Sequence, residues 1–278
     1  MISTDGPDLY GLVGHPVAHS RSPLIHRRFA EQTGQQIEFV LIDVAPGEFI
    51  GQVASFRCRG GRGLNVTLPY KGDACDYADR LSERARLAAA VNTLAWLEDG
   101  QVFGDNTDGA GLVADLQINL DVALDGRRIL LMGAGGAARG ALAPLAAAGP
   151  AEIVIANRTV SRAAALAAQF RGVGSITATG YQDIDGAFDV IINATSASLE
   201  RTVPPLPESV IGADTFCYDM MYQAGPTAFL AWATARGAGG VADGSGMLVE
   251  QAAESFELWR GVRPDTAPVL AEIRSLLV

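Results

Sequence analysis

The sequence has almost no lysine. Only one of its 21 basic residues, Lys71, is a lysine, and arginine supplies the other 20. An arginine side chain stays charged in proteins, whereas a desolvated lysine can release its proton. A chain that avoids lysine elsewhere can retain one where a reaction must move a proton. The alternative is that Lys71 survives on a solvated surface in a chain shaped by an arginine-favouring codon bias.

Cysteine is also scarce, and its positions exclude two classes of protein. The chain has three cysteines, Cys58, Cys75 and Cys217. An odd number without a CxxC pair indicates neither a disulfide framework nor a cysteine-rich metal site, so we expect a reducing, cytoplasmic compartment. The first nine residues carry an acid where a signal peptide has a basic patch. The most apolar stretch, 129–149, contains an arginine, a proline and five glycines, which excludes a membrane span.

Positive charge is lacking as well. The 31 acidic residues outnumber the 21 basic ones, for a formal net charge of −10 and an isoelectric point near 4.8. This balance opposes binding to nucleic acid or to anionic membranes, so we expect a small-molecule ligand held by local donors. With 49% hydrophobic residues, the 278-residue chain is too apolar to be disordered and long enough for two domains. No heptad or apolar stripe sets an oligomeric state, which leaves a homodimer open.

Short apolar runs alternate with stretches of helical spacing along the whole chain. The runs of strand length are Leu9–Val13, Ile37–Ile42, Gly63–Val66, Ile129–Met132, Glu152–Ala156, Asp189–Ile192 and Thr215–Tyr218. This alternation predicts parallel α/β layers. Ser22, with the proline that follows it, predicts the cap of a helix that ends at Gly34, and Pro226 and Gly237 bracket another helix. Residues 98–100 predict a hairpin turn.

The second half of the chain begins like a new domain. A polar tetrapeptide, 125–128, leads into a strand, a glycine turn and a helix, as in a dinucleotide-binding βαβ unit. We therefore expect an N-terminal α/β substrate domain over residues 1–107 and a Rossmann-type, doubly wound parallel-sheet domain over 108–245, with a cleft between them. The C-terminal helices, 246–278, are expected to return to the first domain.

Residues 133–138 read GAGGAA and fit the GxGxxA pattern of dinucleotide-binding turns. Gly133 permits the tight turn, Gly135 lets a pyrophosphate approach the backbone, and Ala138 lets helix and strand pack closely. The free N–H groups at the start of the helix, which is expected over Ala137–Ala148, then face the phosphates. The alternative is a purely structural turn, because Ala/Gly-rich turns are common in this chain.

The end of the next strand favours NADP over NAD. An NAD site offers an acid there to the ribose hydroxyl, but this chain has Asn157, Arg158 and Thr159, with Arg162 one helical turn further on. Two guanidinium groups beside a capping Thr159 suit a 2′-phosphate, which a carboxylate would repel. The alternative is that Arg158 and Arg162 are ordinary surface charges.

The segment Asn65–Lys71 leaves a short strand and is expected to enter a helix at Pro69. Thr67 and Lys71 would then lie at the carboxyl end of the strand, where open α/β sheets bind ligands. Asp108 opens the predicted interdomain helix, where an acid is commonly only a helix cap. A lysine and an aspartate that face each other across a cleft can instead orient and shuttle a proton during ketone reduction.

Two serines precede the first predicted helix. Ser20 and Ser22 place hydroxyl groups ahead of the helix N-terminus, an arrangement that suits a small carboxylate. All three histidines of the chain, His15, His19 and His26, lie in or beside this segment. Their spacing matches no usual metal-ligand motif, so we expect structural or supporting roles for them and no metal site.

Nine short motifs follow one another over nearly the whole chain. They are GHPVAHSRSP, NVTLPYK, AVNTL, GDNTDG, GAGGAARG, NRTVSR, INATS, DMMY and GSGMLVEQ. In this order they resemble the shikimate dehydrogenases. The resemblance implies an oxidoreductase that carries out the NADP-dependent, reversible reduction of 3-dehydroshikimate to shikimate, on the pathway through chorismate to the aromatic amino acids.

The resemblance also implies a role for individual residues. Lys71 and Asp108 would form the catalytic acid–base pair. The substrate-binding residues would be Ser20, Ser22 and Tyr222 at the carboxylate, and Thr67, Asn92, Asp108 and Gln251 at the ring hydroxyls. The NADP-binding residues would be Gly133, Gly135, Gly136, Ala137, Asn157, Arg158, Thr159 and Arg162, with Met220 and Gly244 near the nicotinamide.

Two short segments depart from the family pattern, and both lie near the expected cofactor. The chain has Ala197 and Ser198 after INATS, where the family commonly has glycine, and Gly244-Ser245-Gly246 where it commonly has GLG.

Two alternatives to an NADP-dependent shikimate dehydrogenase stay open. One is a quinate/shikimate dehydrogenase of broader substrate and cofactor use, against which Arg158 argues. The other is a catalytically idle NADPH-binding sensor, against which the intact Lys71, Asp108 and serine set argues.

Overall fold

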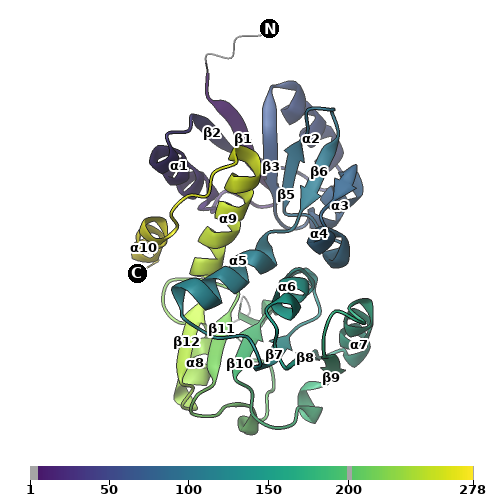
Figure 1. Cartoon of the computed structure of the whole chain (residues 1–278), viewed down its shortest axis with the longest axis vertical. Helices are drawn as coiled ribbons and strands as arrows, with labels where there is room; N and C mark the ends of the chain where they lie inside the picture. Colours follow the sequence, from purple (N-terminus) through teal and green to yellow (C-terminus); the bar gives the residue numbers. More distant parts are fainter. Residues whose placement is uncertain (1–5, 199–201, 278) are drawn as a thin grey trace. The chain divides into compact units, whose positions relative to one another are not determined.

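The computed structural model describes residues 6–198 and 202–277, which form two compact units (Figure 1). The first unit contains the described residues up to Thr107 together with Val249–Ile273, and the second contains Asp108–Leu248 and the described residues from Arg274 onward. The expected α/β fold class, with a Rossmann-type second unit, is confirmed. The assignment of a separate function to each part of the chain stays a prediction.

The first unit is built on a six-stranded mixed sheet. Its elements before Asp108 are β1 (Asp8–Gly14), α1 (Ser22–Thr33), β2 (Ile37–Asp43), α2 (Phe49–Cys58), β3 (Gly61–Val66), α3 (Lys71–Tyr77), β4 (Arg80–Leu81), α4 (Glu83–Ala88), β5 (Thr93–Trp96) and β6 (Val102–Asp105). The strand order is β2-β1-β3-β5-β6-β4. The sheet is parallel through β2, β1 and β3, whereas β5 runs antiparallel to β3 and to β6. The expected hairpin is confirmed, and it adds antiparallel pairs to the parallel strands of this sheet.

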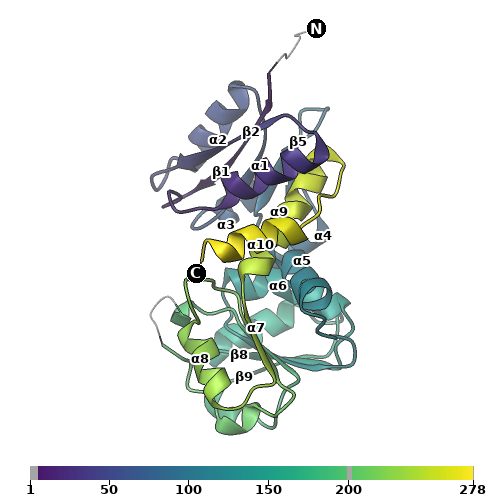
Figure 2. The same cartoon turned by 90° about the vertical axis from the view of Figure 1, so that its left-hand side faces the viewer.

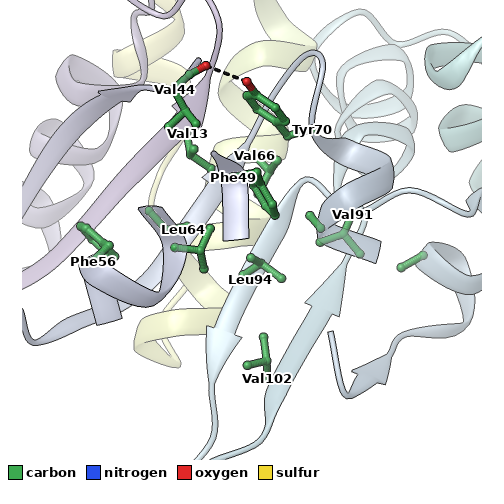
Figure 3. Packing of buried hydrophobic residues seen from close by; sticks show 13 residues of the cluster. Val13, Val44, Phe49, Phe56, Leu64, Val66, Tyr70, Val91, Leu94 and Val102 are labelled. Atoms are coloured by element: carbon green, nitrogen blue, oxygen red, sulfur yellow. Dashed lines mark hydrogen bonds between the residues drawn. The ribbon is translucent and has the colours of Figure 1, made fainter. Parts of the chain in front are cut away.

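Alternate side chains of the first sheet face two different layers. Leu64 and Val66 of β3 join a buried cluster with Phe49 and Phe56 of α2, in which the Tyr70 hydroxyl donates to the main-chain oxygen of Val44 over 2.6 Å (Figure 3). On the opposite face α1 packs over the sheet (Figure 2).

There the ring of His26 stacks on Phe39 of β2 with centroids 4.3 Å apart and approaches the rings of Phe256 and Trp259. Asn65, between Leu64 and Val66, points to this second face because neighbouring strand residues alternate.

The second unit is a doubly wound parallel sheet. Its elements are α5 (Asp108–Ala114), a π-helical turn (Asp115–Asn119), β7 (Arg128–Met132), α6 (Gly136–Ala147), β8 (Glu152–Ala156), α7 (Val160–Gln169), β9 (Ile176–Thr179), β10 (Val190–Asn193), β11 (Phe216–Asp219), α8 (Ala228–Ala235) and β12 (Gly240–Asp243), with short 3₁₀ turns at Tyr181–Asp183, Ser196–Ser198 and Glu208–Val210. All five strand pairs are parallel, in the order β12-β11-β10-β7-β8-β9. Numbered along the chain, this is the 3-2-1-4-5-6 order of Rossmann sheets.

The reversal of strand order lies between β7 and β10, where such sheets bind ligands beyond the carboxyl ends of their strands. Gly133 follows β7, and its φ of +106° lies in a region that residues with side chains rarely adopt. A Cβ atom there would lie 3.0 Å from the main-chain oxygen of Ala194, which follows β10. The glycine turn is therefore packed against the loop after β10.

Two helices follow the second sheet, a long one and a short one. Helix α9 (Ser245–Arg260) begins in the second unit and continues into the first, and α10 (Ala267–Ser275) follows it. Within the first unit, Trp259 of α9 stacks on Tyr10 of β1 with ring centroids 4.7 Å apart and donates to the main-chain oxygen of Leu94 over 3.0 Å. Within the described residues, no helix is both long and apolar enough to cross a membrane.

Three local predictions need correction. Helix α3 begins at Lys71 rather than at Pro69, because Thr67 to Tyr70 form a turn in which the Tyr70 N–H donates to the Thr67 main-chain oxygen over 3.0 Å. Ser22 is the first residue of α1 rather than its cap. Thr159 does cap α7 by position, but its hydroxyl makes no capping hydrogen bond.

Candidate functional site

The serine loop follows β1 and leads into α1. The Ser22 N–H donates to Ser20 Oγ over 3.2 Å, and Ser20 Oγ donates to Ser22 Oγ over 3.1 Å. The hydroxyl of Ser20 therefore accepts the N–H of the first residue of α1, while the cap residue, Arg21, makes no side-chain capping hydrogen bond. The loop lies against the end of β3, because the His15 N–H donates to the main-chain oxygen of Leu68 over 2.9 Å and a Cβ on Gly14 would collide with the side chain of Thr67.

The only lysine is the first residue of α3, directly after the turn that leaves β3. Its main-chain oxygen accepts from the Val91 N–H over 2.8 Å, which holds the start of α3 beside the segment that precedes β5. The Thr67 N–H donates to the main-chain oxygen of Val13 over 2.9 Å. Lys71, Thr67 and the serine loop thus gather at the carboxyl ends of the neighbouring strands β1 and β3, as the sequence predicts.

Asn92 lies at the centre of a group of buried hydrogen bonds. Its side chain is 3% exposed. Its Nδ2 donates to Thr107 Oγ1 over 2.9 Å and to Gln251 Oε1 over 3.4 Å, and its Oδ1 accepts from the Thr107 N–H over 2.9 Å. The structure thus brings together two residues that the resemblance assigns to the ring hydroxyls, Asn92 and Gln251, although they lie 159 positions apart in the sequence.

A second layer of polar side chains lies behind Asn92, and the sequence analysis did not identify it. Asn65 Nδ2 donates to the main-chain oxygen of Asn92 over 3.3 Å, to Thr93 Oγ1 over 3.2 Å and to Ser255 Oγ over 3.0 Å. Asn65 Oδ1 lies 3.1 Å from His26 Nε2, and an amide oxygen can only accept, so this ring nitrogen carries the proton. Burial lowers the pKa of His26 to about 3, so the ring is neutral.

An ion pair secures the chain just before Asp108. Arg84 binds Asp105 through two hydrogen bonds, Nε to Oδ1 over 2.8 Å and Nη2 to Oδ2 over 2.6 Å. Asp105 Oδ1 also accepts from Ser82 Oγ over 2.5 Å and from the Asn106 N–H over 2.7 Å. The neighbouring Arg84 lowers the pKa of Asp105 against the opposing effect of burial, which is the larger single influence. The segment that leads into α5 is therefore held rigidly within the first unit.

The structure places Lys71 in the first unit and Asp108, which is 8% exposed, at the start of the second. The pairing of the two side chains stays a prediction. The same holds for Tyr222, which like Asp108 belongs to the second unit, whereas the remaining expected substrate residues belong to the first.

The glycine turn of the second unit presents an open surface. A Cβ atom on Gly135 or Gly136 would meet no atom within 4 Å, and Gly136, Ala137 and Gly135 are all exposed. Helix α6 begins at Gly136, one residue earlier than its predicted start at Ala137, and has no side-chain cap. Its first N–H groups are therefore available to an anion, and the turn fits the phosphates of a dinucleotide.

The arginines after β8 lie on the surface. Asn157 Nδ2 donates to the main-chain oxygen of Thr159 over 2.9 Å, which shapes the turn that carries Arg158. Arg158 and Arg162 are exposed, and no carboxylate among the described residues pairs with either. Arg158 acts electrostatically on Tyr181, whose pKa burial raises to about 12. The turn after β8 has no acidic side chain that could accept a hydrogen bond from a ribose hydroxyl. This composition agrees with a ligand that carries a 2′-phosphate.

The two departures from the family pattern have structural explanations. Ser198 Oγ donates to Asp219 Oδ2 over 2.5 Å and accepts from Asn193 Nδ2 over 3.0 Å, so its hydroxyl ties the loop after β10 to the end of β11. Ser245 Oγ donates to Asp243 Oδ1 over 2.6 Å, and the same carboxylate oxygen accepts the Ser245 N–H at the start of α9 over 3.1 Å. These hydroxyls strengthen the loops in which they stand.

The Asp219 side chain accepts most of the hydrogen bonds that hold the loop beside Met220. This fully buried carboxylate accepts from Ser198, from Asn193 Nδ2 over 3.3 Å, from Thr227 Oγ1 over 2.6 Å and from the Met221 N–H over 3.1 Å. The structure brings Met220 and Gly244 together, because a Cβ on Gly244 would collide with the Met220 main-chain oxygen. Sequence reasoning quoted Asp219 only as part of a motif, and its several partners become visible only in the fold.

Potential metal ligands do not gather in this structure. Among residues 6–198 and 202–277, no group of three or more histidine, cysteine or acidic side chains is arranged to hold a metal ion. His26 is enclosed by aromatic rings, and His15 Nδ1 lies 2.6 Å from Asp43 Oδ1 at the surface.

Comparison with known proteins gives a consistent result. Three family descriptions match the chain: shikimate dehydrogenase substrate binding domain at residues 12–94, shikimate/quinate 5-dehydrogenase at 115–203, and shikimate 5′-dehydrogenase C-terminal domain at 244–274. A protein of Hahella chejuensis named shikimate dehydrogenase (NADP(+)) is 57% identical over 96% of this chain and 98% of its own length.

Two solved structures are similar throughout. An Ael1 enzyme from Pseudomonas putida has a TM-score of 0.90 and 46% identity, over 96% of this chain and 98% of its own. The shikimate 5-dehydrogenase of Thermus thermophilus, solved in complex with NADP(H) and shikimate, has a TM-score of 0.85 and 33% identity, over 97% of this chain and 100% of its own.

Proposed function

The chain belongs to the shikimate dehydrogenase family, and from this premise we propose that it catalyses the NADP-dependent, reversible reduction of 3-dehydroshikimate to shikimate, on the pathway to the aromatic amino acids. One observation supports this activity above the others. The only lysine of the chain begins α3 at the end of β3, beside the serine loop and the segment that carries Asn92. This position would put an acid–base group at the edge of the sheet that carries polar side chains suited to a hydroxylated ring.

In the proposed reaction Lys71 and Asp108 form the acid–base pair. The main-chain oxygen of Lys71 accepts from Val91, the next residue Asn92 binds both the N–H and the hydroxyl of Thr107, and Thr107 is joined to Asp108 by a peptide bond. Consecutive Cα atoms are only ~3.8 Å apart, so these links support a short distance between the two side chains. Asp108 would orient the ammonium group of Lys71.

Proton transfer is the task of the lysine in this scheme. Lys71 Nζ would donate a proton to the ketone oxygen during reduction and remove it from the hydroxyl in reverse. An arginine could not replace it, because a guanidinium group does not release its proton in this pH range. The proposal thereby accounts for a lysine at this position in a chain that uses arginine at every other basic position.

The substrate would be bound by groups with complementary chemistry. Ser20, Ser22 and Tyr222 would donate hydrogen bonds to its carboxylate, while Thr67, Asn92, Asp108 and Gln251 would bind the ring hydroxyls. Because Asn92 is held on several sides, its orientation is set before substrate arrives, which reduces the entropy lost on binding.

The residues of the second unit fit NADP(H). Gly133, Gly135, Gly136 and Ala137 would bind the pyrophosphate, Asn157, Arg158, Thr159 and Arg162 the adenosine 2′-phosphate, and Met220 and Gly244 the nicotinamide. When bound, NADPH supplies a hydride to the ketone carbon. The hydrogen bonds around Asp219 would keep Met220 in position.

A spectrophotometric assay tests this function. Purified protein is mixed with shikimate and NADP⁺, and the absorbance of reduced nicotinamide is followed, with quinate and NAD⁺ as alternative reactants. We expect the highest kcat/KM for shikimate with NADP⁺. Comparable values with quinate or NAD⁺ would instead identify a quinate/shikimate dehydrogenase of broad specificity. Binding of NADPH without turnover of either acid would identify a sensor and overturn the proposal.

The compartment and assembly belong to the same proposal. All three cysteines are free thiols in the structure, with Cys58 exposed and Cys217 buried, which is compatible with the reducing cytoplasm. Light scattering on the purified protein distinguishes the homodimer that the sequence leaves open from a monomer.

A further inference from the structure

A small pocket lies between α6 and α7 in the second unit, next to the glycine turn. It is lined by Ala134, Arg139, Arg162, Ala165, Leu166 and Gln169 and has a volume of about 280 Å³. Pockets for whole small-molecule ligands have volumes of ~300–1,000 Å³. The pocket is therefore suited to one part of a larger ligand, and Ala134 in its wall places it beside the turn that fits the dinucleotide phosphates.

The pocket has two positive charges and no negative one. Arg139 is the fourth residue of α6, and Arg162 lies in the first turn of α7. None of the lining residues is acidic, and no carboxylate among the described residues forms an ion pair with either arginine. By contrast Arg128, in the same unit, is paired with Glu152 and covers the ring of Phe188.

Arg139 has an unsatisfied donor. Its Nε atom is buried and has no hydrogen-bond partner. A buried donor without a partner costs stability, and a charged one costs more than a neutral one. A structural arginine at this place would be expected to bind a carboxylate or a main-chain oxygen. The missing partner is instead explained if an anionic ligand supplies it.

We propose that Arg139 is a further phosphate-binding residue, which together with Arg162 binds the 2′-phosphate of NADP(H) from the side of α6. This inference rests on the proposed function and deepens it. A phosphate monoester presents several strong acceptor oxygens and close to two negative charges, so guanidinium groups from two helices can bind it at the same time. Selectivity for NADP over NAD would then depend on the residue directly after the GxGxxA motif, and not only on the turn after β8.

Binding measurements on the full-length protein test this proposal without relying on turnover. Isothermal titration calorimetry compares 2′,5′-ADP, which carries the 2′-phosphate, with 5′-ADP, which has a pyrophosphate and no 2′-phosphate. Arg139→Gln is expected to weaken binding of 2′,5′-ADP roughly tenfold or more, the size expected for the loss of a charge-assisted hydrogen bond, and to leave binding of 5′-ADP unchanged. Arg139→Lys keeps the positive charge but not the planar guanidinium group with its paired N–H donors, so it should recover part of the lost affinity for 2′,5′-ADP.

A matched control and the opposing outcomes make the test decisive. Arg171→Gln removes an exposed arginine from the same unit, outside the pocket, and should change neither affinity. Equal weakening for both nucleotides would assign Arg139 to a part that they share, such as the 5′-phosphate, and overturn the proposal, as would unchanged binding of 2′,5′-ADP. If Arg139→Gln does not fold, Arg139→Lys gives the same comparison. A wild-type protein that fails to bind 2′,5′-ADP would instead count against the proposed function as a whole.

Discussion

The polar side chains proposed to bind the substrate and those proposed to bind the cofactor differ in how the protein holds them. In the first unit Asn92 is buried and hydrogen-bonded to Thr107 and Gln251, and Asn65 binds its main-chain oxygen from behind. In the second unit Arg158 and Arg162 are exposed, and no carboxylate among the described residues pairs with them. The first arrangement is held by hydrogen bonds within the chain, whereas the second presents cationic groups to the solvent.

The difference follows from the chemistry of the two ligands. Neutral hydroxyl groups bind weakly to a mobile amide, so a site for them gains specificity when its donors and acceptors are already oriented. A phosphate brings its own charge and forms strong hydrogen bonds to flexible guanidinium groups. The two parts of the chain should therefore respond differently to substitution.

The largest expected effect is that of Lys71→Arg. The substitution keeps the positive charge but removes a group that can release its proton. We expect kcat to fall by roughly 10²-fold or more, as for the loss of an acid–base catalyst, with much less change in the binding of shikimate. Steady-state kinetics together with a direct titration of shikimate check this, and near-normal turnover would remove Lys71 from its proposed role.

The double substitution Arg158→Ala and Arg162→Ala should separate the two cofactors. Without guanidinium groups at the 2′-phosphate, the affinity for NADPH should fall by roughly 10²-fold, because each charge-assisted hydrogen bond contributes ~1.5–3 kcal/mol. The affinity for NADH should change little. Fluorescence titration with both nucleotides measures the ratio, and equal losses for the two would refute the assignment to the phosphate.

Asn65→Leu tests whether the buried layer orients Asn92. Leucine fills a similar volume but leaves the buried His26 Nε2–H and the hydroxyl groups of Thr93 and Ser255 without one of their partners. We expect the free energy of unfolding to drop by about 2 kcal/mol or more and the KM for shikimate to rise. The affinity for 2′,5′-ADP serves as the internal control and should stay constant, because Asn65 belongs to the other unit. A change confined to stability would limit Asn65 to a structural role.

The smallest effect concerns pH and the neutral ring of His26. Burial lowers its pKa to about 3 in the folded chain, whereas an unfolded histidine titrates near ~6.5. Between these values the unfolded chain binds a proton that the folded chain does not, so stability is lost as the pH falls through this window. Above pH ~6.5 the ring is neutral in both the folded and the unfolded chain, so this loss of stability is absent.

His26→Gln provides the matched measurement. Glutamine keeps an N–H donor for Asn65 but does not titrate. Urea unfolding between about pH 4 and pH 6 should show a pH slope that is smaller in the variant, by up to ~1.4 kcal/mol per pH unit. Identical slopes for the two proteins would show that His26 does not remain neutral in the fold.

Local patterns made much of the fold predictable. The strand Glu152–Ala156 was predicted to the residue because a short apolar run lies between turns, and the glycine turn with its helix was predicted because all its parts are consecutive. Strands β4, β9 and β12 were not predicted. Each has four residues or fewer, and in β9 and β12 none of the four is fully buried, so there is little apolar pattern to recognise.

The hydrogen-bond networks could not be predicted from the sequence in the same way. Asn65 lies 190 positions from Ser255, and their contact depends on the strand register and on the path of α9. In the sequence Arg139 stands out only as the one arginine of the apolar stretch 129–149. Its place in a pocket depends on how α6 and α7 pack, which no local spacing reveals.

The central claim is that this chain transfers a hydride between the carbinol carbon of shikimate and NADP⁺. Shikimate that carries deuterium on the carbon of the oxidised hydroxyl is incubated with the protein and NADP⁺, and the reduced nucleotide is analysed by mass spectrometry. The account predicts that the deuterium appears in the NADPH that is formed. Reduced nucleotide without deuterium, or no reduced nucleotide at all, would contradict it.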